Sequence, residues 1–184
     1  SSVADNLPGP VQATPVDLTA PEKVAELFDS LDQVPETVIH CAGSGYFGPI
    51  EGQDPSEINK LIENNVTSSI FLLRELVARY REHKVNVVVV MSTAAQLAKA
   101  GESTYCAAKW AVRGLVESVR LELKGSPMKL IAVYPGGMAT DFWKTSGKAL
   151  DTSSFMTAGE AAKMLKQALV ATEHGFVSDI TINR

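Results

Sequence analysis

Short runs of β-branched residues alternate with longer segments of helical periodicity along this chain, and this alternation restricts the fold more than any other feature. The strand-like runs are VQATPVDL (11–18), TVIHCAG (37–43), VNVVVVMS (85–92), MKLIAVYPG (128–136) and GFVSDITI (175–182). Strands that alternate with helices are typical of βαβ units, whose helices cover a parallel sheet. The sequence therefore predicts an α/β fold.

The predicted helices begin at residues that commonly start a helix. Thr19 is the predicted N-cap of a helix with Pro21 in its first turn, and Asp54 with Pro55 opens a much longer helix. Apolar residues at helical spacing then give each segment a buried face. The predicted helices span 21–31, 55–82, 102–123 and 158–171.

Length and composition suit one folded domain. The chain has 184 residues, of which 45% are hydrophobic and 21% charged, as in ordinary globular proteins. The net charge of -4, without a basic run, argues against a nucleic-acid surface. The longest apolar run, 85–91, is too short to cross a membrane. Two isolated cysteines and the lack of a signal-like start indicate the reducing cytoplasm.

The pattern Tyr-x-x-x-Lys occurs twice, as Tyr105 with Lys109 in STYCAAKW and as Tyr80 with Lys84 in RYREHKV. Residues four apart share one helix face, so either pair could project into a cleft. The second pair lies among charged residues at a helix end, which indicates a solvated surface. The first pair begins a helix after a strand and a loop, at the sheet edge where parallel α/β proteins bind ligands.

Ser92 distinguishes the pair Tyr105–Lys109 from the pair Tyr80–Lys84. It ends the predicted strand 85–92 and precedes Tyr105 by 13 residues, which is enough for a loop to return the chain to that strand end. The residue 13 positions before Tyr80 is Thr67, which lies in the middle of a predicted helix. A strand-end hydroxyl, a phenol and an ammonium group are therefore expected together only around Tyr105.

In this order and spacing the chain resembles the short-chain dehydrogenases/reductases. Ser92, Tyr105 and Lys109 match the family's Ser and Tyr-x-x-x-Lys, and Asn65 matches its catalytic Asn better than Asn64 does. The resemblance implies a Rossmann-like, doubly wound parallel sheet in three layers, α/β/α. It also implies one dinucleotide-binding and catalytic domain over 1–184, and an NAD(P)-dependent oxidoreductase that interconverts a carbonyl and an alcohol.

Further motifs match those by which the family binds its cofactor, NAD or NADP. VIHCAGSG resembles the family's Asn-Asn-Ala-Gly strand end, although His40 and Cys41 replace the two asparagines. YPGGMATDF resembles the Pro-Gly motif at the nicotinamide end, and Asp17 with Leu18 resembles the pair that contacts adenine. The cofactor contacts implied by the resemblance are Asp17, Leu18, Ala42, Gly43, Tyr105, Lys109, Pro135, Gly136, Met138 and Thr140.

The residue types agree with this chemistry. A phenol has a reference pKa near ~10, and a nearby cation such as Lys109 is expected to lower it. Tyr105 would then exchange a proton with the substrate oxygen while Ser92 stabilises its charge. By resemblance, Lys109 also holds the nicotinamide ribose and Asn65 supports a water chain to solvent. Phe142, Trp143 and Met156 are candidate lids over a partly apolar small-molecule substrate, although they could equally cover the core.

One family motif, the Gly-rich turn after the first strand, has no counterpart in the sequence. In the strand order 3-2-1-4-5-6, two strands would lie between 11–18 and 37–43. We therefore expect this sequence to be a fragment of a longer protein. The alternative is a chain that has lost cofactor binding.

Two other functions stay open from the residues alone. One is a catalytically silent interaction protein, assembled as a homo-oligomer through the long helices 55–82 and 102–123. A dimer or tetramer built in this way is also the expected assembly of an enzyme. The other is an epimerase or dehydratase, for which the segment after the Pro-Gly motif leaves little room. No metal site is expected, because His40, His83 and His174 lack metal-ligand spacing.

Overall fold

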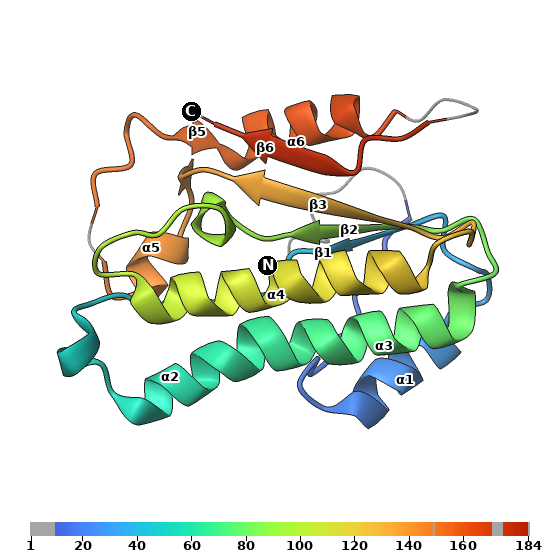
Figure 1. The fold of residues 1–184 in the computed structure, drawn as a ribbon, viewed down its shortest axis with the longest axis horizontal. Helices are drawn as coiled ribbons and strands as arrows, with labels where there is room; N and C mark the ends of the chain where they lie inside the picture. Colours follow the sequence, from blue (N-terminus) through green and yellow to red (C-terminus); the bar gives the residue numbers. More distant parts are fainter. Residues whose placement is uncertain (1–9, 149, 171–174, 184) are drawn as a thin grey trace.

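The computed structural model describes residues 10–148, 150–170 and 175–183. Its main sheet has four parallel strands in the order β1-β2-β3-β6 (Figure 1). In register, Ile39 pairs with Val88 and Val88 pairs with Ile131. The strands are β1 (Thr37–His40), β2 (Asn86–Val90), β3 (Lys129–Pro135) and β6 (Asp179–Ile182). The predicted α/β fold around a parallel sheet is confirmed.

The helices follow the predicted segments closely. Their bounds are α1 (Pro21–Asp29), α2 (Pro55–Ile62), α3 (Ser68–Tyr80), α4 (Ser103–Glu122) and α6 (Ala158–Ala168). The predicted helix 55–82 is interrupted by one wide π-helical turn, η3 (Glu63–Thr67), which joins α2 to α3. The predicted end of the last helix, Ala171, and His174 lie outside the described residues.

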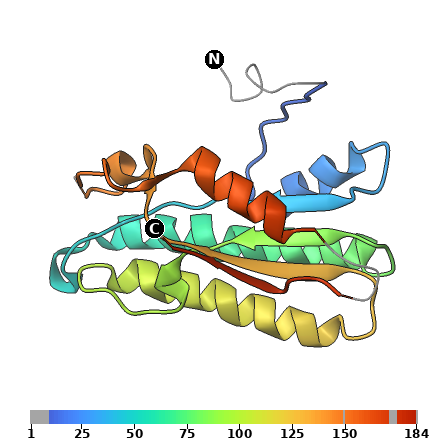
Figure 2. The same ribbon diagram turned by 90° about the horizontal axis from the view of Figure 1, so that it is seen from above.

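Strand side chains alternate between two cores, and this places helices on both faces of the sheet. Val87 and Val89 of β2 pack with buried residues of α1, α3 and α4, whereas Val88 packs with residues of α6 on the other face. Figure 2 shows α4 and α6 on opposite sides of the strands. The arrangement is the predicted three-layer α/β/α sandwich.

The predicted first strand, 11–18, was wrong. Residues 10–16 have no regular secondary structure, and a turn begins at Asp17, whose carboxylate accepts hydrogen bonds from the Thr19 backbone N–H and hydroxyl. A strand needs a neighbour, and among the described residues β1 pairs only with β2. Within the described ranges, the outer edge of β1 therefore has no strand beside it, and the side chain of Ile39 in β1 is 51% exposed.

Two further details differ from the sequence-based expectation. Ala20, not Thr19, is the N-cap of α1, because the Thr19 hydroxyl is bonded to Asp17. Asp54 does cap α2, accepting from two backbone N–H groups. Tyr80 was expected on a solvated surface, but its ring is buried against Phe28, with centroids 6.0 Å apart. The amphipathic face of α3 extends to its last residue and so draws the ring into the core.

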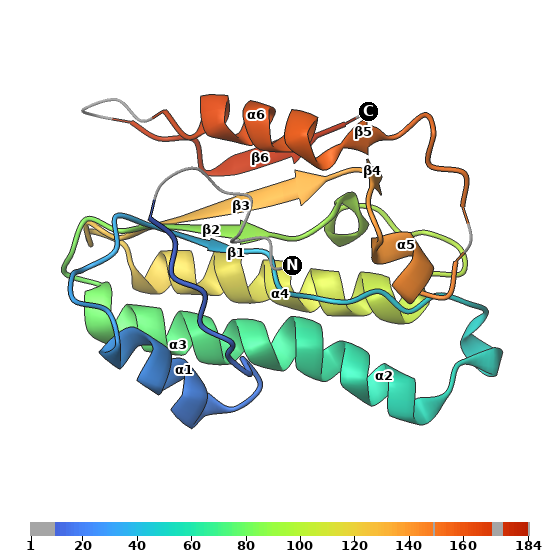
Figure 3. The ribbon, with the colours of Figure 1, turned by 180° about the vertical axis from the view of Figure 1, so that it is seen from behind.

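Short elements gather where the parallel strands end. A two-stranded sheet joins β4 (Met138–Ala139) to β5 (Met156–Thr157), and α5 (Phe142–Thr145) lies between them in sequence. The 3-10 turns η2 (Ile50–Gly52) and η4 (Thr93–Ala95) complete the loops. Figure 3 shows the strands pointing toward the side of the molecule that carries α5. Over the described ranges, no helix is both long and apolar enough to span a bilayer.

Candidate active site

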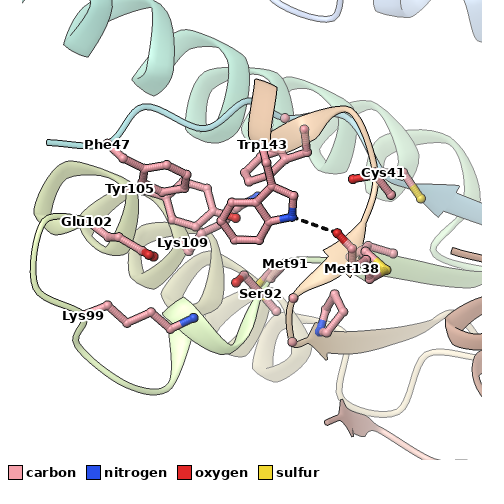
Figure 4. A pocket seen from close by; sticks show the side chains of 17 residues that line it. Cys41, Phe47, Met91, Ser92, Lys99, Glu102, Tyr105, Lys109, Met138 and Trp143 are labelled. Carbon is pink, nitrogen blue, oxygen red and sulfur yellow. Dashed lines mark hydrogen bonds between the residues drawn. The ribbon is translucent and has the colours of Figure 1, made fainter. Parts of the chain in front are cut away.

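A cavity of about 160 Å³ lies at the carboxyl ends of β1, β2 and β3. Parallel strands direct their carboxyl ends to one edge of a sheet, and ligands of α/β proteins bind there. Figure 4 shows Ser92, Tyr105 and Lys109 around this cavity. The cavity brings together most of the predicted site residues, namely Gly43, Ser92, Tyr105, Lys109, Pro135, Gly136, Met138 and Thr140.

Ser92 and Tyr105 meet because β2 and α4 are joined by a short loop. Ser92 follows β2 and caps η4, its Oγ accepting from the Ala94 N–H at 3.1 Å, which leaves the hydroxyl proton free for another acceptor. Tyr105 lies in the first turn of α4 and is almost wholly buried. Burial raises the pKa of Tyr105 to about 12, although a hydrogen bond with Ser92 acts in the opposite direction.

Lys109 lies one helical turn beyond Tyr105, with its Nζ 5.5 Å from the centre of the tyrosine ring. Burial lowers the pKa of Lys109 to about 8, so the ammonium form still predominates at neutral pH. The prediction that Lys109 lowers the pKa of Tyr105 was wrong. Both side chains are removed from water, and the cost of burying the phenolate exceeds any help from an ammonium that is itself poorly solvated.

Asn65 lies in the wide turn η3 and is 1% exposed. Its Nδ2 donates to the carbonyls of Ser44 and Leu61, each at 2.9 Å. Two carbonyl acceptors settle the orientation of the amide, because the flipped group would place its own oxygen against them. Asn65 Oδ1 is left buried without a hydrogen-bond partner. Such an atom is costly unless something else satisfies it.

Gly43 follows β1 and explains why the loop can pass so near these side chains. Its φ is +155°, and a Cβ built there would lie 2.6 Å from Asn65 Oδ1 and 3.3 Å from Lys109 Nζ. Only glycine therefore fits between the strand end and the two side chains. Asn65 does not line the cavity itself but lies behind Gly43, beside Lys109.

The other predicted cofactor contacts lie in a neighbouring cavity of about 320 Å³. Asp17, Leu18 and Ala42 line it, and Gly43 lines both cavities. The two hydrogen bonds from Thr19 lower the pKa of Asp17, so its carboxylate is ionised at neutral pH. The predicted residues therefore form two adjoining groups that meet at Gly43.

Aromatic rings cover the end of the first cavity that holds Tyr105. Phe47 lies edge-on to Tyr105 at 5.2 Å, and Phe142 contacts both rings. Trp143 stacks near Phe47 and donates its Nε1–H to the Met138 carbonyl at 2.8 Å. Phe142 and Trp143 thus lie where the lid prediction placed them. Met156 does not, because it is buried in β5 within the core under α6.

Sequence reasoning missed Phe47 and the ion pair between Glu102 and Lys148. The carboxylate of Glu102 is buried just before α4 and lies 3.0 Å from Lys148 Nζ, in the segment after α5. Lys148 also lies over the Phe47 ring, 5.4 Å from its centre. Oppositely charged residues 46 positions apart leave no local pattern, so no signal in the sequence singled them out.

No three His, Cys, Asp or Glu side chains gather closely enough to hold a metal ion in the part of the chain that the structure describes. Cys41 lines the first cavity, and burial raises the pKa of its thiol. The described cavity therefore offers hydroxyl, phenol, ammonium, thiol and carboxylate groups for its chemistry.

Comparison with known proteins agrees with this fold. The sequence profile of the family described as short chain dehydrogenase matches residues 2–151. The crystal structure of a short-chain dehydrogenase/reductase from Vibrio parahaemolyticus is 64% identical with a TM-score of 0.86, and the match covers 93% of this chain and 75% of that chain. An alcohol dehydrogenase from Thermococcus sibiricus complexed with 5-hydroxy-NADP shares the fold at 20% identity, TM-score 0.80, over 91% of this chain and 72% of that one.

A curated relative matches a smaller part of this chain. The 3-ketodihydrosphingosine reductase of Mus musculus is 31% identical over 101 residues, which are 54% of this chain and 30% of that protein. The chain spans less than a third of the length of the curated relatives that it matches first.

Proposed function

Because the chain belongs to the short-chain dehydrogenase family, we propose that it is an NAD(P)-dependent oxidoreductase that interconverts a carbonyl and an alcohol. The observation that carries this proposal is the shared cavity of Ser92, Tyr105 and Lys109 at the carboxyl ends of the strands. The family profile and the arrangement of the residues support the same reaction class. Within this proposal, 1–184 acts as a single dinucleotide-binding and catalytic domain.

The proposed cofactor is NAD or NADP, and the residues present fit it. Gly43 presents bare backbone between two adjoining cavities, where any Cβ would collide with Asn65. Asp17, Leu18 and Ala42 would hold the adenine side, and Pro135, Gly136, Met138 and Thr140 the nicotinamide side. The nicotinamide supplies or accepts a hydride. Titration with NADH and with NADPH, followed by nicotinamide fluorescence, tests this and measures the preference between them.

Tyr105 is proposed as the proton donor to the substrate oxygen during reduction. Its raised pKa keeps the phenol protonated at neutral pH, which is the form that carbonyl reduction requires. Ser92 would donate its free hydroxyl proton to the same oxygen and stabilise the charge that develops there. In alcohol oxidation the phenolate would accept the proton instead.

Lys109 and Asn65 are proposed to support that proton transfer. Lys109 would hold the nicotinamide ribose, and its ammonium protons lie next to Tyr105. The unsatisfied Asn65 Oδ1 faces Gly43 on the same side as Lys109 Nζ. A water molecule bonded to both would extend the path by which Tyr105 regains its proton from solvent.

The substrate is proposed to be a small molecule with a partly apolar body. Phe47, Phe142 and Trp143 line the same cavity as Ser92, and Figure 4 shows the rings of Phe47 and Trp143 around it. Flat aromatic side chains bury apolar surface well and tolerate varied shapes. With Met156 in the core, these three rings carry the substrate proposal.

The decisive experiment replaces Tyr105 by Phe and follows cofactor oxidation with a panel of aldehydes and ketones. Removing the proton donor should lower turnover by at least about 10²-fold while the far-ultraviolet spectrum stays unchanged. Tyr80→Phe is the matched control, because its ring packs against Phe28 far from the cavity. Equal activity of the wild type and Tyr105→Phe would reject the proposed mechanism.

A homo-oligomer is proposed as the assembly, as a dimer or tetramer. Ile62 and Ile70 on the α2–α3 segment and Trp110 on α4 are exposed, Trp110 by 47%. Large apolar side chains on neighbouring helices are typical of surfaces that associate. The same surface would serve a catalytically silent interaction protein, for which Tyr105→Phe should change nothing. The cytoplasmic location also stays a proposal.

A further inference from the structure

β1 ends in a buried histidine that the proposed reaction does not use. His40 occupies the first of the two positions where the family motif has asparagine, and its ring is 4% exposed. Its Nε2 lies 2.9 Å from the hydroxyl of Ser69 in α3. A polar ring at the end of a strand thus contacts the helix that follows η3.

The direction of these hydrogen bonds can be worked out from the partners. Ser69 Oγ donates its one proton to the Asn65 backbone carbonyl at 2.6 Å. It can therefore only accept from His40, which requires the proton of the neutral ring to lie on Nε2. Burial, and then the charge of Lys109, lowers the pKa of His40 to about 4, so the ring is neutral under ordinary conditions. The chain of donors runs from His40 through Ser69 to Asn65.

Asn65 is thereby held at both of its ends. Ser69 binds its backbone carbonyl within the wide turn, and the Ser44 and Leu61 carbonyls bind its side-chain amide. These contacts leave Oδ1 facing Gly43 and Lys109. Wide turns of this kind lack regular α-helical hydrogen bonding and are common at functional sites. A side-chain hydrogen bond such as that of Ser69 can therefore stabilise the turn.

We propose that His40 is a positioning residue for the proposed reaction: through Ser69 it holds the turn at Asn65, so that Asn65 Oδ1 stays directed toward Gly43 and Lys109. Without the histidine donor, the Ser69 hydroxyl is free to rotate away from the Asn65 carbonyl. This inference rests on the proposed function for its effect on turnover. Its geometric part can be tested without any activity.

The activity-free test observes the side-chain amide of Asn65 by ¹H–¹⁵N NMR in four variants. His40→Leu and Ser69→Ala remove the donor and the relay, so both should shift the Asn65 amide signals in the same way. His40→Gln should leave them near their original positions, because its amide nitrogen lies about as far along the side chain as Nε2. Ser126→Ala is the control, since it also removes a buried hydroxyl, bonded to the Arg81 carbonyl at the far end of α3. Unchanged Asn65 signals in His40→Leu would overturn the proposal.

The kinetic test uses the same variants with NADPH and NADH and the carbonyl panel. His40→Leu should lower kcat several-fold with little change in the KM of the cofactor, and His40→Gln should restore most of it. The double variant of His40→Leu with Ser69→Ala should be no worse than either single variant, because both interrupt one chain. Additive losses would contradict the proposal, as would a loss of stability alone with kcat intact.

The two proposals fail in different ways. A wild type that oxidises neither cofactor with any substrate of the panel would count against the proposed function, while the NMR comparison would still decide the role of His40. A wild type that turns over but shows no effect of His40→Leu on kcat or on the Asn65 signals would reject the positioning role alone.

Discussion

Gly43 and Asn65 touch so closely that the strand end and the helix turn leave no space for a side chain between them. A Cβ on Gly43 would lie 2.6 Å from Asn65 Oδ1. This contact brings the carboxyl end of β1 against the wide turn η3, and the same built Cβ would lie 3.3 Å from Lys109 Nζ.

Gly43→Ala should therefore destabilise the protein and impair the site together. The new methyl group forces Asn65 to move, and the backbone at φ +155° is one that residues with a Cβ rarely adopt. We expect a loss of about 1–3 kcal/mol in the free energy of unfolding, measured with urea. Gly48 has a similar φ of +147°, but a Cβ there would meet open space. Gly48→Ala therefore measures the cost of the backbone conformation alone. Equal losses at Gly43 and Gly48 would show that the contact with Asn65 is unimportant.

Lys109 should make stability rise with pH in mildly alkaline solution. Its pKa is about 8 in the folded protein and 10.5 as the ordinary value, so between these the unfolded chain binds a proton that the folded chain has released. The free energy of unfolding then increases with pH, in total by at most about 3 kcal/mol. Tyr105 acts oppositely between pH 10 and about 12, so the comparison stays below pH 10.

The measurement compares urea unfolding of the wild type, Lys109→Met and Lys84→Met from pH 7.5 to 10. The advantage of the wild type over Lys109→Met should grow across this range. Lys84 is exposed, so Lys84→Met is the control for replacing a lysine outside the cavity. A constant difference for Lys109→Met would contradict the burial of its ammonium group.

The ion pair of Glu102 with Lys148 should hold the segment that carries Phe142 and Trp143 against the start of α4. Its carboxylate is buried and 3.0 Å from the ammonium nitrogen, unlike the exposed pair of Asp141 and Lys144 in the same segment. Exposed pairs contribute little, whereas a buried one holds its partner more firmly. Glu102→Gln should speed proteolytic cleavage within 140–150 several-fold and change the KM of carbonyl substrates. Asp141→Asn should do neither, and equal cleavage of the two variants would remove the case for a fastening role.

Asp17 should contribute to cofactor affinity at the adenine end of the proposed cofactor site. Asp17→Ala should weaken binding of the reduced cofactor several-fold, measured by fluorescence titration. Asp151 makes the same kind of turn, accepting from the Ser153 N–H at 2.9 Å, but lies elsewhere. Asp151→Ala therefore controls for the loss of the turn itself. Unchanged binding by Asp17→Ala would remove Asp17 from the proposed site.

The parts of the fold that could be predicted from the sequence are those that depend on local residue patterns. The alternation of strands and helices, the cap at Asp54 and the position of Ser92 thirteen residues before Tyr105 all depend on neighbours along the chain. They correctly placed Ser92, Tyr105 and Lys109 around one cavity. The strand assigned to 11–18 failed because a strand is defined by its partner, and no described strand pairs with that segment.

The parts that could not be predicted depend on contacts between distant residues. The ion pair of Glu102 with Lys148 and the bond between His40 and Ser69 join residues whose separation shows no pattern. The prediction of a lowered pKa for Tyr105 failed for a related reason. Burial decides the direction of the pKa shift, and the spacing to Lys109 does not reveal burial. The wide turn at Asn65 has no sequence signal, since its residues fit an α-helix equally well.

The wide turn η3 also makes the length of this helix a matter of exact residue count. A π-helical turn accommodates one residue more than an α-helical turn, so one residue removed from 63–67 would restore even winding while α2 and α3 keep their buried faces. Leu61 would then stay in the core, whereas Asn65 would lose the wide turn that places it against Gly43. A single-residue deletion here should accordingly preserve the fold and impair the site.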